Sequence, residues 1–181
     1  MSLFSLSGCW PERVLVVLGT LLVAACAGDR DPPSMGEPSF YRSLATANAK
    51  VDAAMASSMI SGYRKNNGLG AVSIDPALMR MAEELARAMA SRDKLDHDVG
   101  RDFNARIRGS GYDARVAVEN IGAGYHTLAQ AFSGWRDSPS HRANMLNREA
   151  SHMGIAAVYS PRSKYKVFWA LIMAAPDGRR G

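Results

Sequence analysis

The chain has 181 residues, of which 47% are hydrophobic and 22% are charged. This composition is typical of a soluble globular domain, and it excludes a disordered chain, a collagen-like chain and a polytopic membrane protein. The formal charge of +5 weakly favours anionic ligands or surfaces and carries no information about the fold. Both cysteines, Cys9 and Cys26, precede the body of the chain. The body therefore has no disulfide framework, cysteine nucleophile or thiolate metal site.

The first segment has the pattern of an export signal. An uncharged apolar run, Val14 to Ala25, follows Arg13. As a helix it would rise only about 18 Å, which is too short to span a bilayer, so residues 1–25 are predicted to be a signal peptide. The run ends in Val-Ala-Ala-Cys, which resembles the lipobox of bacterial lipoproteins. The resemblance implies that Cys26 is lipidated and anchors the chain in a membrane. The alternative is ordinary secretion with Cys26 as a spare thiol.

Composition also divides the rest of the chain. Residues 26–40 are polar and rich in proline, which predicts a tether between the anchor and a folded domain. The domain is expected to span residues 41–176 and to be followed by a short basic tail, residues 177–181.

Helical patterns dominate the first part of the domain. Residues 49–66 are expected to form an amphipathic helix that ends before Asn67-Gly68. Asp75-Pro76 is a typical helix start, an N-cap followed by proline at the first helical position. The helix that starts there carries apolar residues on one face: Leu78, Met81, Ala82, Leu85 and Met89. Shorter helices are predicted for residues 102–108, from Thr127 through Trp135, and from Ser138-Pro139 to Leu146.

Strands are predicted between and after these helices. One begins at Val116 and runs into Glu119-Asn120-Ile121, and two more, residues 153–159 and 165–174, are joined by a turn. The last strand is apolar almost throughout, as expected of a strand that is covered on both faces. The sequence therefore predicts an α+β fold in which a small antiparallel sheet lies between two helical layers.

Three polar residues at the edges of these elements are candidate site residues. Glu119 follows Val118 on a strand, where a buried carboxylate is costly unless it is paired. His97 follows the most strongly patterned helix, and His141 lies in a first helical turn, whose positive end disfavours protonation. If the three side chains converge, they match the ligand set of a catalytic zinc site with an open fourth position. Their spacing alone fixes no such geometry.

Longer blocks of sequence carry a family resemblance. The blocks are His97-Asp98, Gly111-Tyr112, Glu119-Asn120-Ile121, Trp135-Arg-Asp-Ser138-Pro139-Ser-His141-Arg142-Ala-Asn144, and Met153-Gly154-Ile155. In this order they resemble the CAP superfamily (cysteine-rich secretory proteins, antigen 5, pathogenesis-related 1) in its short bacterial form. The resemblance implies a three-layer α-β-α sandwich, in agreement with the layers predicted above.

The resemblance also implies a cleft lined by two histidines and two glutamates, where some members bind a divalent metal. His97, Glu119 and His141 match three of these positions, and Ser138, preceded by Asp137, stands at the fourth. The missing carboxylate weakens the case for a metal such as zinc, and no other cofactor is indicated. Glu119 is either a general base or a residue that orients an imidazole. Asn120, Ser138, Arg142 and Asn144 are candidate ligand contacts. Ser138 is most simply a helix cap, because Pro139 follows it, and Arg142 and Asn144 could equally satisfy local backbone carbonyls.

Three functions are compatible with these residues. The favoured one is a non-catalytic module, lipid-anchored to the cell envelope, that binds a lipid or another small amphiphile in the His/Glu-lined cleft. The alternatives are a metal-dependent hydrolase of peptide or envelope polymer, with Glu119 as base and metal on the histidines, and a module that binds envelope proteins. Nucleic acid is not an expected partner, because the chain is predicted to be exported and its basic residues are scattered without an aromatic stacking motif.

Overall fold

The computed structural model describes residues 36–178. The predicted signal peptide, Cys26 and most of the predicted tether therefore lie outside the described residues. The described chain is a mixed α+β domain, as predicted. Its elements are α1 (Ala53–Asn66), β1 (Ser73–Ile74), α2 (Pro76–Arg92), α3 (Phe103–Gly109), β2 (Ala114–Ala123), α4 (Leu128–Asp137), α5 (Pro139–Met145), β3 (His152–Tyr159) and β4 (Val167–Pro176).

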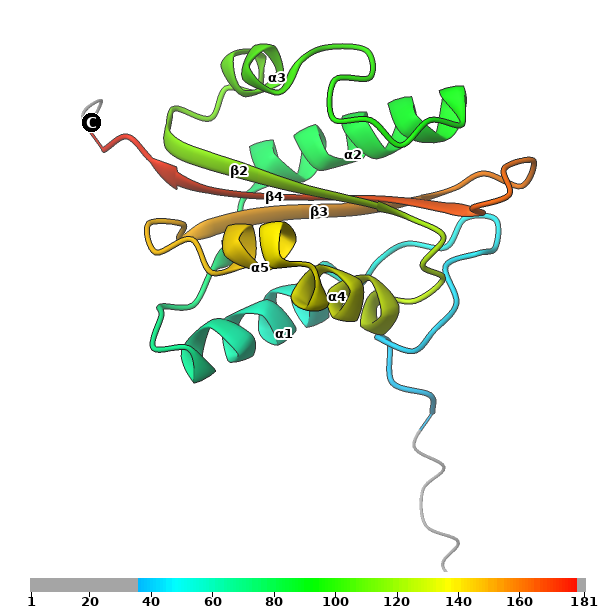
Figure 1. The fold of residues 1–181 in the computed structure, drawn as a ribbon, viewed down its shortest axis with the longest axis horizontal. Coiled ribbons are helices and arrows are strands. Elements are labelled where there is room, and N and C mark those ends of the chain that lie inside the picture. Colours follow the sequence, from blue (N-terminus) through cyan, green and yellow to red (C-terminus); the bar gives the residue numbers. More distant parts are fainter. Residues whose placement is uncertain (1–35, 179–181) are drawn as a thin grey trace, which may run out of the picture. The chain divides into compact units, whose positions relative to one another are not determined.

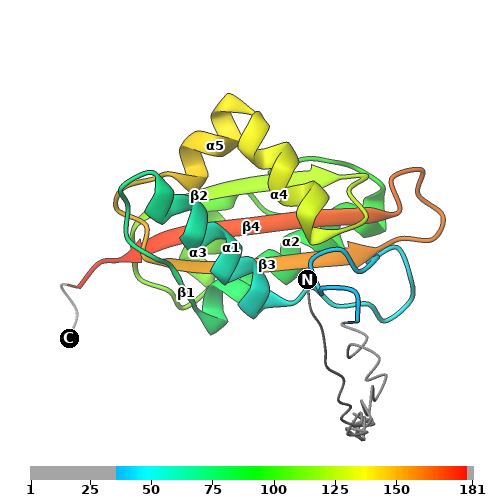
Figure 2. The same ribbon diagram turned by 90° about the horizontal axis from the view of Figure 1, so that it is seen from below.

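The elements form the three layers that the sequence predicts. Figure 1 shows α2 and α3 on one face of the sheet and α1, α4 and α5 on the other. Seen from below, α4 and α5 lie toward β2, and α1 lies toward β3 and β1 (Figure 2). The strand order is β1-β3-β4-β2. The strand β2 is therefore one edge of the sheet, and β3 borders the other edge wherever the short β1 does not cover it.

Strand β4 is the centre of the domain. All of its residues except Pro176 are buried, which confirms the prediction of a strand covered on both faces. Its side chains alternate between the two helical layers, as the twofold repeat of a strand requires. Trp169 packs edge-on against Trp135 of α4, with ring centroids 6.2 Å apart, whereas Phe168 joins the cluster under α2. Two apolar cores, one on each face of the sheet, result.

Helix boundaries follow from their capping residues. At α2, both the Ala77 and Leu78 amides donate to Asp75, and the helix ends at Asp93 in a left-handed conformation. Helix α1 begins later than predicted, because Asp52 caps it by accepting from the Met55 amide.

The prediction of an antiparallel sheet was wrong in one respect. The sheet is not wholly antiparallel, since Ser73–Ile74 pairs in parallel with the start of β3. The two residues are exposed and too few to show a periodic pattern. Within residues 36–178, no helix has the length and apolarity needed to cross a bilayer.

Candidate functional site

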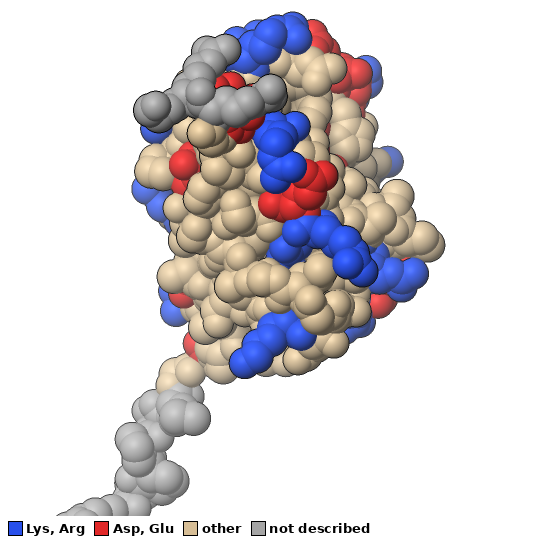
Figure 3. Space-filling view, turned by 90° about the vertical axis from the view of Figure 1, so that its left-hand side faces the viewer, with Lys and Arg blue, Asp and Glu red and all other residues tan. Residues whose placement is uncertain are grey.

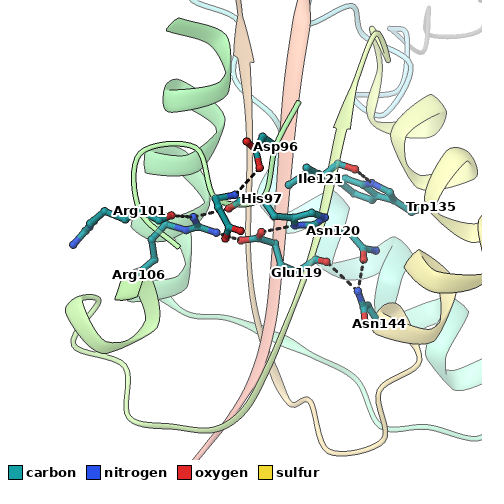
Figure 4. Close-up of polar contacts among 10 residues, drawn as sticks. Asp96, His97, Arg101, Arg106, Glu119, Asn120, Ile121, Trp135 and Asn144 are labelled. Atoms are coloured by element: carbon teal, nitrogen blue, oxygen red, sulfur yellow. Dashed lines mark hydrogen bonds and ion pairs between the residues drawn. The ribbon is translucent and has the colours of Figure 1, made fainter. Parts of the chain in front are cut away.

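The sequence-predicted site residues gather around β2, the strand at the edge of the sheet. Successive side chains of a strand point to opposite faces, and here Glu119 turns toward the α2–α3 layer while Asn120 turns toward α5. Figure 4 shows His97 and Arg106 on one side of this strand and Asn144 on the other. We call these residues, together with His141, the β2-edge network. It joins the two helical layers around the edge of the sheet.

Glu119 is a buried carboxylate with two partners. Its side chain is only 4% exposed, its Oε1 lies 2.7 Å from Nδ1 of His97, and its Oε2 accepts from Nη2 of Arg106 at 2.6 Å (Figure 4). The requirement that a carboxylate at this position be paired is thus met. A carboxylate oxygen accepts, so Nδ1 of His97 is the donor in this contact, and the side chain of His97 is 51% exposed. Glu119 thereby fixes the orientation of the His97 ring.

Arg106 holds this arrangement together and was missed by the sequence analysis. Its side chain is 1% exposed, and besides Glu119 it donates through Nη1 to the carbonyls of His97, at 2.8 Å, and Arg101. One guanidinium thus fixes both the backbone that carries His97 and the carboxylate that orients its ring. The signal for it was its spacing, since Arg106 lies one turn after Phe103 and shares that residue's inward face of α3.

On the other side of β2, two asparagines attach α5 to the sheet. The Nδ2 of Asn120 donates to the His141 carbonyl at 2.9 Å, and its Oδ1 accepts from Nδ2 of Asn144 at 2.9 Å. Asn144 also donates to the Glu119 carbonyl at 2.9 Å. Asn144 was expected to contact either a ligand or a backbone carbonyl. The geometry supports the backbone carbonyl, which belongs to Glu119 in β2 and not to the helical turn of Asn144.

His141 enters the site from α5 and titrates below its ordinary range. Burial lowers the pKa of His141 below 6.5, and the charge of His97 lowers it further. The pKa of His141 is therefore lowered, as the sequence predicts. The leading cause is burial, however, and the positive end of α5 is not among the causes. The contacts of Glu119 with the His97 ring and of Asn120 with the His141 carbonyl place the two histidines on opposite sides of β2.

The lowered pKa of His141 predicts a dependence of stability on pH. Below a pH of about 6.5 the unfolded chain binds a proton at this histidine that the folded chain resists. The free energy of unfolding should therefore fall as the pH drops below about 6.5, and His141→Gln should flatten that slope. Urea unfolding between about pH 5 and pH 7 measures it, with Ser140→Ala at the exposed neighbouring position as control. An unchanged slope in His141→Gln would contradict the assignment.

The fourth position of the predicted cleft carries no buried carboxylate. Ser138 occupies the N-cap position of α5, but its side chain makes no capping hydrogen bond and lies 3.3 Å from the Ser140 hydroxyl. Asp137 faces solvent in an ion pair with Arg136 at 2.8 Å, and that hydrogen bond lowers the pKa of Asp137, with a smaller contribution from the charge of Arg142. Arg142 is exposed. Neither Asp137 nor Ser138 replaces a second glutamate.

The residues do not fit a metal centre with three protein ligands. Both oxygens of Glu119 are already engaged, which leaves the imidazoles of His97 and His141 as the candidate donors. Within residues 36–178, no group of three or more His, Cys, Asp or Glu side chains is arranged to hold a metal ion. Metal binding by the two histidines stays a prediction, and we derive no reaction step from it.

Trp135 is a core residue of α4: it is 1% exposed and donates its indole N–H to the Ile121 carbonyl at 3.0 Å.

The domain is a three-layer α-β-α sandwich with Glu119, Asn120 and two histidines at its edge strand, and it belongs to the CAP class of domain. The model of the cysteine-rich secretory protein family, CAP, matches residues 58–173. The chain belongs to this family.

Individual relatives agree with that membership. The Bacillus subtilis protein YkwD is 29% identical over 105 residues, which cover 56% of this chain and 40% of that protein. An extracellular SCP-domain protein from Bacillus anthracis has a TM-score of 0.59 at 20% identity, over 67% of this chain and 39% of its own. An outer surface protein from Borrelia burgdorferi has a TM-score of 0.63 at 20% identity, over 71% of this chain and 98% of its own. The chain thus spans less than half the length of either Bacillus protein, and at these identities the structures show the fold alone.

Proposed function

We propose that this protein is a non-catalytic binding module that holds a small anionic amphiphile. The observation that carries the proposal is a groove of about 610 Å³ between the segment 47–51, helix α2 and strand β3, which is within the usual size of ligand sites. The groove borders the sheet at the side opposite the β2-edge network. We call it the β3 groove, and its lining comprises Ala47, Asn48, Ala49, Lys50, Val51, Met79, Arg80, Glu83, Arg87, Ile155, Ala156, Ala157, Val158, Tyr159 and Pro161.

The chemistry of the β3 groove suits a molecule with an apolar body and an anionic group. Its walls are largely aliphatic, with Val51, Met79 and Val158 among them, and its cationic side chains are exposed. Arg87 is paired with Glu83 at 2.5 Å. Lys50 and Arg80 have no ion-pair or hydrogen-bond partner among the described residues, so both charges are available to a ligand.

The proposal moves the ligand away from the cleft expected from the sequence. The amides of Asn120 and Asn144 are engaged in attaching α5 to β2. Glu119 is bound on both oxygens, so it orients His97 instead of accepting a proton from water. This engagement disfavours the alternative of a hydrolase with Glu119 as its general base.

The proposal includes export and membrane attachment. Its structural neighbours include an extracellular protein and an outer surface protein, which supports export, and lipidation of Cys26 would supply the anchor. We include no nucleic acid among the partners. On the face that Figure 3 shows, basic and acidic side chains alternate and form no continuous cationic surface.

The test is binding of laurate to the full chain carrying Cys26→Ala. Isothermal titration should detect about one equivalent of laurate and weaker binding of dodecanol, which has the same chain without the charge. Arg80→Glu should weaken laurate binding about tenfold, which corresponds to about 1.4 kcal/mol.

The matched control for that variant is Arg108→Glu, an equal charge reversal at an exposed position of α3 that does not line the groove. It should leave laurate binding unchanged. Absence of laurate binding, or equal effects of the two reversals, would refute the proposal.

A further inference from the structure

Strand β3 has an open edge inside the β3 groove. Its other edge pairs with β4 along its whole length. On the open side, β1 reaches only the first two residues, since Ser73 pairs with His152 and Ile74 with Met153. Beyond Met153 no strand among the described residues flanks β3 on that side. An uncovered strand edge presents backbone donors and acceptors to any chain that can approach it.

The backbone groups at this edge can be assigned from two hydrogen bonds. The Met153 carbonyl faces outward, because it accepts from the Asp75 amide at 2.9 Å. The Ile155 amide also faces outward, toward Met79 Sδ at 3.3 Å. Since the two sides alternate along a strand, Ala157 and Tyr159 also turn their N–H and C=O groups to the open side. Those of Ala157 have no hydrogen-bond partner among the described residues.

We propose that the β3 groove binds an acidic peptide in an extended conformation, which adds a strand to the edge of β3. This inference rests on the proposed function and names the chemistry of the amphiphile, which carries backbone amides as well as apolar and anionic groups. The peptide pairs with the N–H and C=O of Ala157, rests its apolar side chains on Val51 and Val158, and directs its carboxylates to Lys50 and Arg80. Backbone pairing supplies affinity in such complexes, and the flanking side chains supply specificity.

The shape of the site favours a slender, extended ligand. A second groove of about 560 Å³ continues from the first, because both are lined by Arg87, Val158, Tyr159 and Pro161. It leads past Ser160 to Arg162 at the β3–β4 turn. A strand of about five residues extends about 17 Å, and the two grooves together run along β3 from the segment 47–51 to the β3–β4 turn. The segment 47–51 and helix α2 flank the edge, so a single strand can enter where a whole second sheet would meet both walls. A simple lipid would fill the apolar space and leave the Ala157 groups unpaired.

The experiment uses the full chain carrying Cys26→Ala and the blocked peptide Val-Val-Glu-Glu-Val, which presents both valine and glutamate on each face of an extended strand. The peptide should bind, and exchange of the Ala157 amide with solvent should slow. N-methylation at one set of alternate residues should weaken binding about tenfold, while methylation of the other set should have little effect, because only every second residue of an added strand faces β3. Equal effects of the two methylated peptides would overturn the inference.

Titrations of laurate and of the peptide on the same chain distinguish this inference from the proposed function. A variant tests the backbone pairing itself: Ala157→Pro removes the outward amide, and proline is tolerated on an open strand edge. It should abolish peptide binding. Should the variant fail to fold, the methylated peptides decide the question on the unaltered groove. Laurate binding without peptide binding would overturn the peptide inference and leave the proposed function standing. Absence of both would overturn both.

Discussion

Replacing Arg106 by methionine is expected to lower the free energy of unfolding by about 3–5 kcal/mol, the cost of removing one partner of a buried ion pair. The guanidinium is buried against Glu119, with 1% and 4% of the two side chains exposed. Methionine retains much of the apolar volume. What is lost is the charge that neutralises Glu119 and the donor to the carbonyl of His97. A buried carboxylate without its cation then remains beside a histidine.

The measurement is urea unfolding near pH 7, with Arg108→Met as control. Arg108 occupies an exposed position on the same helix, and its replacement should change the free energy by no more than about 0.5 kcal/mol. Adding Glu119→Gln to Arg106→Met should restore part of the lost stability, because no isolated charge is then buried. A double variant that is less stable than Arg106→Met would show that the ion pair is not the source of the loss.

The elements with strong patterns were predictable from the sequence. Helix α2 has both a capping signal and an apolar face, and β4 is apolar along nearly its whole length, so local composition was sufficient for each. The layers followed from the order of the predicted elements, and the family resemblance agreed with them. His97, Glu119 and His141 stood out by their places at the edges of elements, and the resemblance matched them to a cleft. Their spacing did not predict that the three residues lie close together, because about 22 residues separate each from the next. They meet because the strand order places β2 at an edge of the sheet.

One buried arginine could not be assigned from sequence. Arg64 is 1% exposed and donates to the carbonyls of Gly70, Met145, Asn147 and Ala150. Burial lowers the pKa of Arg64. An arginine at the end of a helix is normally expected in solvent, and the carbonyls that satisfy this one come mainly from a part of the chain some 80 residues away. Such partners are set by tertiary structure and leave no local signal.

The β3 groove escaped prediction for a related reason. Its walls come from the segment before α1, from α2 and from β3, and no motif links them. Its open edge arises from the shortness of β1, an element that lacks any periodicity. The family resemblance directed attention to the β2 edge instead, where the amides and the carboxylate turn out to be hydrogen-bonded to one another and to the backbone.

Replacing Gly154 by alanine is expected to lower the free energy of unfolding by about 3 kcal/mol, the upper end of the usual cost of overpacking. A Cβ at this position of β3 would overlap the backbone of Leu78 and Met79 in α2. Both backbone segments belong to regular elements, the strand β3 and the helix α2, and Leu78 is fully buried. Neither backbone can withdraw without separating the helix from the sheet, so the absence of a side chain is what lets α2 approach β3.

Two other glycines provide the controls. Gly134→Ala in α4 would place its Cβ against the hydroxyl of Tyr125, a side-chain end that can rotate away, and should cost about 1–2 kcal/mol. Gly62→Ala in α1 meets nothing within 4 Å and should raise stability by about 0.5–1 kcal/mol, the helix preference of alanine over glycine. Urea unfolding of the three variants should therefore rank Gly62→Ala above Gly134→Ala and Gly154→Ala last. If Gly154→Ala were as stable as the unaltered chain, the close approach of α2 to β3 would not be what requires glycine there.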